Sequence, residues 1–431
     1  MKKPAFLPEK ERNLGAIDGK GIMERLTRRQ RPERMKDMKV LVGLSGGVDS
    51  AVAAWKLKQE GYDVSCCFMR NWDSFANNDF AGNPEIFNDI CPQEQDYLDA
   101  KAVADHLGLE LLRIDFIREY WDYVFTAFLK EYSVGRTPNP DILCNKYIKF
   151  DAFYQYAKDL GFDAIATGHY ASNRRDENGF VWMTRAADQN KDQTYFLAQV
   201  AEKPLSETLF PIGPLTKPEV RAIATDLELE SVASKKDSTG ICFIGERNFR
   251  QFLSNYLPAQ EGEIVDIDTG TVVGTHQGTL YYTIGQRKGL HIDHFKGPWF
   301  VAGKDVPNNR LLVARTDHDH WLYSDSCLVK DINWIIPEGF EVPEAITCKF
   351  RYRQPDQDIL IERLDDTTAM VRYPQKIASV TAGQEAVFYM GDICLGGGVI
   401  EQVFNEGEDL NSVLVKTAQD NLNKRKANGA G

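Results

Sequence analysis

One six-residue stretch constrains this chain more than any other: residues 45–50 are Ser-Gly-Gly-Val-Asp-Ser. An apolar run at 38–44 precedes it and predicts a buried strand, and residues 51–58 follow it as a predicted helix. The two glycines let the backbone turn sharply and approach a ligand closely. The first helical turn then presents N–H groups and the positive end of the helix dipole. This order of strand, glycine turn and helix predicts a phosphate-binding site.

The stretch differs from the two common nucleotide loops. A Walker loop needs a lysine after its glycines, and the dinucleotide fingerprint needs three spaced glycines; both are missing here. The stretch resembles instead the SGGxDS loop of the ATP-pyrophosphatase (PP-loop) family. That resemblance implies cleavage of ATP between the α and β phosphates, with AMP left on a substrate oxygen. An ordinary strand-to-helix turn is the alternative, and the intact motif after a strand favours the nucleotide.

The size and composition of the chain indicate a globular protein of two or three domains. It has 431 residues, of which 43% are hydrophobic and 26% charged. No apolar run approaches the roughly 20 residues of a membrane helix, so we expect no membrane association. The 8 cysteines form no CxxC pair, which argues against a zinc ribbon and favours a reducing compartment. The net charge of −12 argues only weakly against a nucleic-acid partner, because the clustering of basic residues decides this.

The order of predicted elements divides the chain. Strands and helices alternate from residue 38 to about 229, which predicts an α/β domain with a doubly wound, Rossmann-like parallel sheet. Beyond about residue 257, short alternating runs and turn signals predict two smaller, mostly-β domains, the last a β-barrel. The expected parts are a basic flexible arm (1–35), a PP-loop catalytic domain (36–230), a central adaptor domain carrying Cys242 (231–318), a C-terminal β-barrel (319–405) and a polar tail (406–431).

The first 34 or so residues are polar and rich in Arg and Lys. They have no apolar core, so they are not a secretory signal. Several acidic residues argue against a mitochondrial presequence. A flexible arm, or a start codon assigned too early, fits better. We therefore expect a cytoplasmic protein, with the mitochondrial matrix as the alternative.

A second informative stretch is Gly-Arg-Thr-Pro-Asn-Pro-Asp-Ile-Leu-Cys-Asn at 135–145. Pro140 fits the first position of a helix, which puts Cys144 in or near the first turn. The helix dipole and two nearby lysines would stabilise a thiolate there. Asp141 could orient a group or shuttle a proton. The alternative is a buried, inert cysteine on a helix.

Cys242 lies in a third stretch, the glycine-flanked Ser-Thr-Gly-Ile-Cys-Phe-Ile-Gly at 238–245. This pattern predicts a mobile loop that carries a sulfur in and out. Alone it is weak, and an inert cysteine would be favoured. Its force comes from the combination with an AMP-transferring loop and with Cys144.

Together the motifs resemble those of tRNA-specific 2-thiouridylases, over about residues 38–403. The matching stretches are SGGVDS (45–50), GRTPNPDILCN (135–145), ATGHY (166–170), KDQTYFL (191–197), KKDSTGICFIGERNF (235–249), YTIGQRKGL (282–290), FRYRQ (350–354) and FYMGDICLGGG (388–398). The basic arm, a long loop at 73–92 and the polar tail depart from the family pattern. None of these departures removes a motif residue.

The resemblance implies a mechanism. ATP adenylates O2 of the wobble uridine, and sulfur then displaces AMP from C2. Cys242 carries the sulfur as a persulfide, Cys144 is the second nucleophile that can form a disulfide with Cys242, and Asp141 is the acid or base. Attack by persulfide and attack by hydrosulfide freed by Cys144 both stay open. The implied ATP contacts are Gly43, Leu44, Ser45, Gly46, Gly47, Val48, Asp49 and Ser50, with Met69 and Gly168 near adenine and ribose.

The resemblance also implies the tRNA contacts. The target base leaves its stack in the anticodon loop, which suits sequence-specific recognition of RNA. The implied base contacts are Asn139, Pro140 and Asp141, and the implied tRNA contacts are His169, Lys191, Asp192, Gln193, Arg351, Tyr352 and Gln384. A lone histidine such as His169 is more often a satisfied core residue. Arg351 and its neighbours could otherwise form a solvated strand edge.

The expected cosubstrates and partners follow from this mechanism. They are ATP with Mg²⁺, which neutralises the triphosphate, tRNA, and a persulfide donor protein or cysteine desulfurase relay. We expect a monomer without a resident metal site. Two other functions compete: a PP-loop synthetase fed by an amidotransferase, and an RNA-binding protein with an inactive nucleotide fold. No glutaminase domain is evident for the first, and the intact loop argues against the second.

Overall fold

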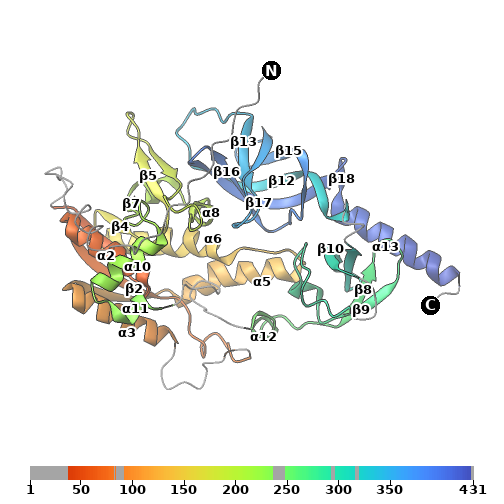
Figure 1. Cartoon of the computed structure of the whole chain (residues 1–431), viewed down its shortest axis with the longest axis horizontal. Helices are drawn as coiled ribbons and strands as arrows, with labels where there is room; N and C mark the ends of the chain where they lie inside the picture. The colour runs from red at the N-terminus through yellow and green to blue at the C-terminus, as the bar shows by residue number, and fades with distance from the viewer. Residues whose placement is uncertain are drawn as a thin grey trace, which may run out of the picture.

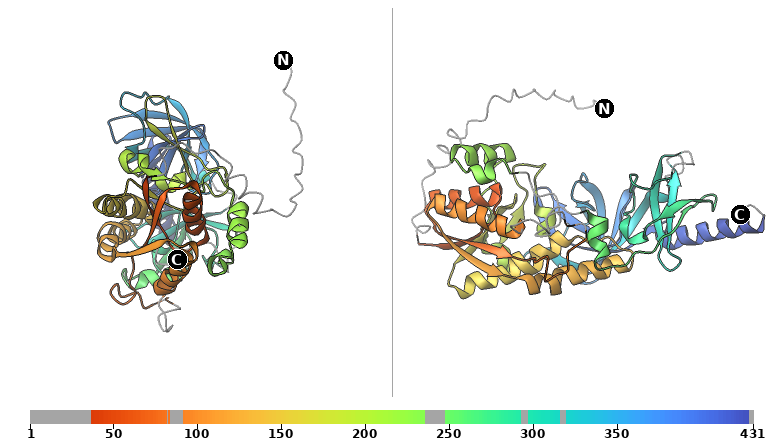
Figure 2. Two further views of the ribbon diagram at one scale, coloured as in Figure 1. Left: turned by 90° about the vertical axis from the view of Figure 1, so that its left-hand side faces the viewer. Right: turned by 90° about the horizontal axis from the view of Figure 1, so that it is seen from below.

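The computed structural model describes residues 37–81, 83, 92–235, 248–292, 297–315 and 320–428. The predicted arm and the predicted loop around Cys242 lie outside these residues. The protein is elongated, with the phosphate-loop domain at one end and the C-terminal helix at the other (Figures 1 and 2). The β-barrel lies between them, above the long central helices in Figure 1.

The first domain is built on a five-stranded, fully parallel sheet in the order β3-β2-β1-β4-β7. Its strands are β1 (Lys39–Gly43), β2 (Asp63–Arg70), β3 (Glu110–Asp115), β4 (Ala164–Ala166) and β7 (Thr208–Leu209). Later strands add to both sides of β1, which confirms the predicted doubly wound sheet. The direction of winding reverses between β1 and β4, and ligands bind outside the carboxyl ends of strands at such a point.

Helices cover both faces of this sheet because β1 alternates its apolar side chains. Val40 and Val42 belong to one buried cluster and Leu41 to another. The first face carries α2 (Val48–Glu60), α3 (Pro92–Leu107), α10 (Lys217–Asp226) and α11 (Glu230–Ala233). The second carries α4 (Ile117–Glu119), η2 (Tyr120–Phe125), α5 (Thr126–Ser133), α6 (Pro140–Cys144), η3 (Asn145–Ala152) and α7 (Phe153–Asp159). Shorter helices are α8 (Thr194–Leu197), α9 (Glu202–Ser206) and α12 (Phe249–Ser254).

The second half of the chain is mostly β, as predicted. A central four-stranded sheet has the order β10-β11-β8-β9, from β8 (Gly262–Asp266), β9 (Val272–His276), β10 (Trp299–Asp305) and β11 (Arg310–Arg315), with a short helix η4 (Thr279–Tyr281). A barrel follows, from β12 (Tyr323–Trp334), β13 (Ala345–Lys349), β14 (Gln357–Arg363), β15 (Ala369–Ala378), β16 (Glu385–Met390) and β17 (Ile393–Asn405). Pairing of β12 with β17 closes it, which confirms the predicted C-terminal barrel.

A hairpin of the first domain joins the barrel sheet. It consists of β5 (Ser172–Arg175) and β6 (Val181–Thr184), and Thr184 pairs with Ile393 of β17. The first domain and the C-terminal barrel are therefore linked by backbone pairing.

The stretch from residue 406, predicted only as a polar tail, forms regular secondary structure. A short strand, β18 (Glu408–Asp409), leads into an 18-residue helix, α13 (Leu410–Ala427). Its apolar residues recur every four positions and are buried: Leu410, Leu414, Ala418 and Leu422. The Asp409 side chain caps it by accepting from Ser412 N–H at 2.7 Å. These four buried residues pack the otherwise polar helix against the core of the β domains. Within the described ranges, no helix is long and apolar enough to cross a bilayer.

Candidate active site

The phosphate loop is stabilised by hydrogen bonds of its own serine hydroxyls. Ser50 Oγ accepts from the Ser45 N–H at 3.1 Å and donates to the Gly47 carbonyl at 3.0 Å. Gly46 has φ +71°, and a Cβ there would lie 2.3 Å from the Asp96 carbonyl oxygen. Gly47 is the N-cap of α2 and offers no side-chain cap to its first turn. The loop therefore turns as predicted, and among the described residues no side chain caps the first turn of α2.

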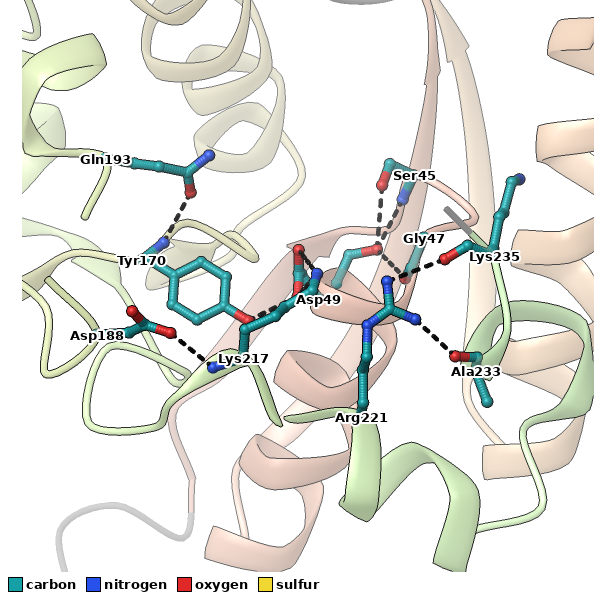
Figure 3. Close-up of polar contacts among 11 residues, drawn as sticks. Ser45, Gly47, Asp49, Tyr170, Asp188, Gln193, Lys217, Arg221, Ala233 and Lys235 are labelled. Carbon is teal, nitrogen blue, oxygen red and sulfur yellow. Dashed lines mark hydrogen bonds and ion pairs between the residues drawn. The ribbon is translucent and has the colours of Figure 1, made fainter. Parts of the chain in front are cut away.

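The carboxylate of the loop is paired. Asp49 receives the Lys217 ammonium, with Nζ at 2.8 Å from each carboxylate oxygen, and the Tyr170 hydroxyl at 2.9 Å (Figure 3). The Lys217 side chain is only 9% exposed, and its backbone N–H donates to Asp188. A buried lysine needs such a partner, and the pair cancels a negative charge that would otherwise repel phosphate.

A second lysine reaches the loop from the other side. Lys235 Nζ donates to the Gly46 carbonyl at 3.2 Å, to Asp96 at 2.6 Å and to Asp99 at 2.8 Å. Arg221 donates to the carbonyl oxygen of Lys235, which fixes the backbone there (Figure 3). Burial disfavours the charged form of Lys235, but the hydrogen bonds to both carboxylates outweigh it and raise its pKa.

Met69 and Gly168 both lie at the loop. A Cβ on Gly43 would be 3.1 Å from Met69 Cε and 3.6 Å from a ring carbon of Phe153. A Cβ on Gly168 would be 2.7 Å from the Ser50 backbone nitrogen. The structure therefore brings both residues to the carboxyl ends of β1 and β4, where adenine and ribose contacts were predicted.

The helix that carries Cys144 begins as the sequence predicts. Pro140 is its first residue, and the Asn139 side chain caps it by accepting from the Asp141 N–H at 3.2 Å. The helix continues through the π-helical segment η3 into α7, and π-helical segments are frequent at functional sites. Asp141 and Cys144 are thus placed on one helix that runs past the phosphate loop at Phe153.

The Cys144 thiol is fully buried, at 0% exposure, in the apolar cluster between this helix and α8. The next residue, Asn145, donates to the Phe196 carbonyl at 2.9 Å, and Lys146 donates to Gln199 at 3.0 Å. The buried carboxyl of Glu385, on barrel strand β16, lies in the same polar network. Burial raises its pKa to about 7, although Lys146 and Gln199 pull it down.

The first-domain residues that were predicted to contact tRNA make hydrogen bonds within the protein. His169 is buried against Phe150 and shares a hydrogen bond of 2.8 Å with Thr167; burial lowers its pKa well below the usual value. Asp192 is 2% exposed and accepts from Ala186 N–H and the Thr194 hydroxyl.

Gln193 and Lys191 flank that aspartate. The Gln193 side chain accepts from the Tyr170 backbone at 2.9 Å (Figure 3). Lys191 is half-buried. Gln193 is therefore placed beside Tyr170, which itself contacts Asp49 of the phosphate loop.

The barrel residues divide into two groups. Tyr352 packs on Phe196 at 4.4 Å between ring centroids, so it joins the α8 region next to Gln193. Arg351 turns the other way and donates to Ile284, Ser379 and Thr381, and burial lowers its pKa. These bonds tie the barrel to the central domain, and the tRNA contact of Arg351 stays a prediction.

Gln384 reaches the cysteine segment. Its side-chain amide donates to the Thr137 carbonyl at 2.7 Å, two residues before Asn139. Of the barrel residues, Gln384 and Tyr352 thus lie near the helix of Cys144, while Arg351 contacts the central domain.

Sequence reasoning missed the polar residues around the loop. Lys217, Asp96 and Asp99 carry no spacing signal, because their partners lie far away along the chain. Tyr170 had a signal, since it ends the ATGHY stretch, and Lys235 begins the stretch of Cys242. Cys242 itself lies outside the described residues. In the part of the chain that the structure describes, no group of three or more His, Cys, Asp or Glu could hold a metal ion.

Family models match nearly the whole folded chain. They are described as a tRNA methyl transferase HUP domain at residues 38–246, a tRNA methyl transferase PRC-barrel domain at 250–315 and an aminomethyltransferase β-barrel domain at 324–400. The three ranges agree with the three structural parts. Helix α13 lies beyond the matched ranges.

Several curated relatives are similar over their full length. "tRNA-specific 2-thiouridylase MnmA" of Mycoplasma capricolum is 56% identical, covering 85% of this chain and 99% of that protein. The protein of the same name from Mesoplasma florum is 55% identical over 85% and 99%, and that from Staphylococcus aureus 48% identical over 88% and 99%. A solved structure titled "U34-tRNA thiolase NcsA from Methanococcus maripaludis" is 16% identical, covers 52% of this chain and 69% of that chain, and has a TM-score of 0.32, too low to inform the site.

Three findings indicate the same family: the doubly wound domain has an intact phosphate loop, two β domains follow it in the matching order, and relatives near 50% identity match over their full length. The chain belongs to the tRNA-specific 2-thiouridylase family.

Proposed function

We propose that this protein is an ATP-dependent tRNA sulfurtransferase that makes 2-thiouridine at the wobble position. One observation carries the proposal: a glycine loop shaped for phosphate at the switch point of the sheet, in a chain whose full-length relatives are named tRNA-specific 2-thiouridylases. The family-model descriptions mention methyl transfer, but the relatives' names and the ATP-type loop favour thiolation.

The first step is adenylation. O2 of uridine attacks the α phosphate of ATP, pyrophosphate leaves, and the resulting AMP ester is a good leaving group at C2. The helix N-terminus at Gly47 and the loop N–H groups hold the phosphates. Mg²⁺ arrives on the triphosphate, since Asp49, the carboxylate of the loop motif, has both oxygens engaged by Lys217.

The second step transfers sulfur. The terminal sulfur of a Cys242 persulfide attacks C2 and AMP leaves. Cys144 thiolate then attacks the Cys242 sulfur, which releases 2-thiouridine and leaves a Cys144–Cys242 disulfide for later reduction. Asp141, one helical turn before Cys144, is the acid or base of the reaction. Hydrosulfide freed by Cys144 is the alternative attacking species.

The proposed substrate contacts rest on the family resemblance. The target base is held against Asn139, Pro140 and Asp141 at the start of the helix. The remaining proposed tRNA contacts are His169, Lys191, Asp192, Gln193, Arg351, Tyr352 and Gln384. The barrel binds the tRNA, a persulfide donor or cysteine desulfurase relay supplies sulfur, and the protein acts as a cytoplasmic monomer.

Two cysteine substitutions test the proposal. Purified protein is incubated with tRNA transcript, MgATP and a sulfur source, and pyrophosphate and nucleosides are measured. Wild type is expected to release pyrophosphate only with tRNA and to yield 2-thiouridine by mass spectrometry. Cys144→Ser and Cys242→Ser are expected to keep pyrophosphate release and lose the thionucleoside, because adenylation precedes sulfur attack.

Cys66→Ala is the matched control, since Cys66 is buried in the sheet and burial raises its pKa to about 12. It is expected to keep thiolation. Thiolation retained in both serine variants would remove the two-cysteine scheme. A methylated nucleoside would favour a methyl transferase, pyrophosphate release only with a small acceptor would favour another PP-loop synthetase, and no release would favour an inactive nucleotide fold.

A further inference from the structure

The segment just before the cysteine helix is held by all three parts of the chain. Residues 135–137 link α5 to the turn before α6. Lys304 of the central sheet donates to the Gly135 carbonyl at 2.9 Å, and a Cβ on Gly135 would lie 2.5 Å from Val306. Asn411 of α13 in turn bonds both backbone groups of Lys304, at 3.1 Å each. The central domain and α13 thus fix one end of the segment.

Arg136 fixes the middle of the segment to the barrel. Its guanidinium contacts Glu131 at 2.6 Å, Glu401 at 2.8 Å and the Ile400 carbonyl at 3.2 Å. The Arg136 side chain is 18% exposed and that of Glu401 38%, so the charge-assisted bond between them is partly shielded from water, while Glu131 adds an ion pair without hydrogen-bond geometry. A planar guanidinium can hold a helix residue and a barrel strand in one geometry, which a lysine cannot.

Thr137 completes the attachment through its backbone. Its N–H donates to the Ala382 carbonyl at 3.1 Å, and its carbonyl accepts from Gln384 at 2.7 Å. A Cβ on Gly383 would lie 2.7 Å from the Thr137 nitrogen, so the two backbones touch. The contacts span up to 265 positions in sequence.

The chain from Thr137 to Asp141 has little slack. Pro138 and Pro140 each fix φ, and Asn139 is held as the helix cap. A shift of Thr137 would therefore pass into α6 and move Asp141 and Cys144.

We propose that Arg136, with Gln384, is a positioning residue that sets the place of Asp141 and Cys144 from the barrel. It acts through the segment 135–139 and does not touch the base. The kinetic part of this inference rests on the proposed function. Binding of the anticodon arm to the barrel would then be coupled to the position of the helix that carries Cys144.

Arg136→Met in the full chain tests the proposal. At saturating tRNA and ATP, tRNA-dependent pyrophosphate release and thiolation are expected to fall together by about 30-fold, since small misplacement of reacting groups costs up to about 100-fold. The Kd for tRNA is expected to stay within about threefold, and Arg136→Lys is expected to rescue only in part. Arg372→Met is the control, because Arg372 carries the same charge in an exposed barrel ion pair with Glu362.

A second readout needs no activity. Iodoacetamide labelling of Cys144, followed by peptide mass spectrometry, is expected to be at least about fivefold faster in Arg136→Met than in wild type or Arg372→Met, because the buried thiol becomes accessible. If wild type makes no 2-thiouridine, the proposed function fails, and the labelling rates still decide the positioning role.

Three results would overturn the inference: a Kd for tRNA raised tenfold with kcat unchanged, activity equal to that of Arg372→Met, or unchanged labelling of Cys144. Should Arg136→Met fail to fold, Glu401→Gln weakens the same attachment more gently. It is expected to show the same pattern with smaller changes.

Discussion

The phosphate loop and the cysteine segment are both built to place reactive groups, but they are built differently. The turn of the loop is closed by hydrogen bonds within six residues, such as those between Ser45 and Ser50, and distant residues such as Lys235 add to it. The cysteine segment is shaped by contacts with Glu401 and Gln384, 265 and 247 positions away. A local motif can therefore be formed by one strand and one helix, whereas the helix of Cys144 depends on the assembled barrel.

The two regions also differ in their surroundings. Paired charges flank the loop, with Lys217 on Asp49 and Lys235 on Asp96 and Asp99. Cys144 lies among apolar and aromatic side chains instead. The first environment suits a polyanion, and the second keeps the Cys144 side chain away from water in this conformation.

Gly46→Ala should break the local region with the largest effect. The φ of +71° strains any side chain, and the added Cβ would lie 2.3 Å from the Asp96 carbonyl oxygen. Pyrophosphate release is expected to fall on the order of 100-fold, while tRNA binding persists, because only the loop is misplaced. Gly179→Ala is the control, since Gly179 also has positive φ but nothing within 4 Å. Wild-type release by Gly46→Ala would show that the loop conformation does not matter.

Glu385→Gln tests how the barrel next to the cysteine helix responds to pH, measured as the pH dependence of its stability. Burial raises the Glu385 pKa from 4.5 to about 7, so the folded state binds a proton that the unfolded state releases. Its stabilising contribution is complete below about pH 4.5 and is lost as pH rises through about 7. The loss is up to about 3 kcal/mol.

The neutral glutamine should flatten this dependence, so the gain in unfolding temperature over wild type should be larger at pH 8 than at pH 5. Thermal unfolding across that range measures it, with Glu362→Gln as an exposed carboxylate control on the same barrel. Parallel curves for wild type and Glu385→Gln would contradict the assignment.

The smallest effect is expected at Asn139, the cap of the helix that carries Cys144. Asn139→Ala removes the helix cap and should cost about 1 kcal/mol of stability, whereas Asn139→Ser keeps a capping oxygen. The serine variant should nevertheless slow thiolation severalfold, because the predicted base contact needs the amide. Unfolding temperature and single-turnover thiolation separate the two roles. A serine variant with wild-type thiolation would leave Asn139 as a cap alone.

Much of the fold was readable from the sequence. The alternation of strands and helices from 38 to 229 predicted the doubly wound sheet, and the short runs beyond 257 predicted the β domains and the barrel. Helix α13 was missed because its four buried residues are diluted by polar ones. Hydrophobic period, and not overall polarity, decides whether such a tail packs.

The sequence by itself determined the phosphate loop and the start of the cysteine helix, because glycine conformation, proline φ and an asparagine cap act within a few residues. Only the tertiary structure decided that Lys217 pairs with Asp49, that Arg351 supports the barrel from inside, and that Arg136 ties the cysteine helix to β17. These contacts join residues far apart in the chain, and hydrogen bonds of that kind leave no periodic trace in the sequence.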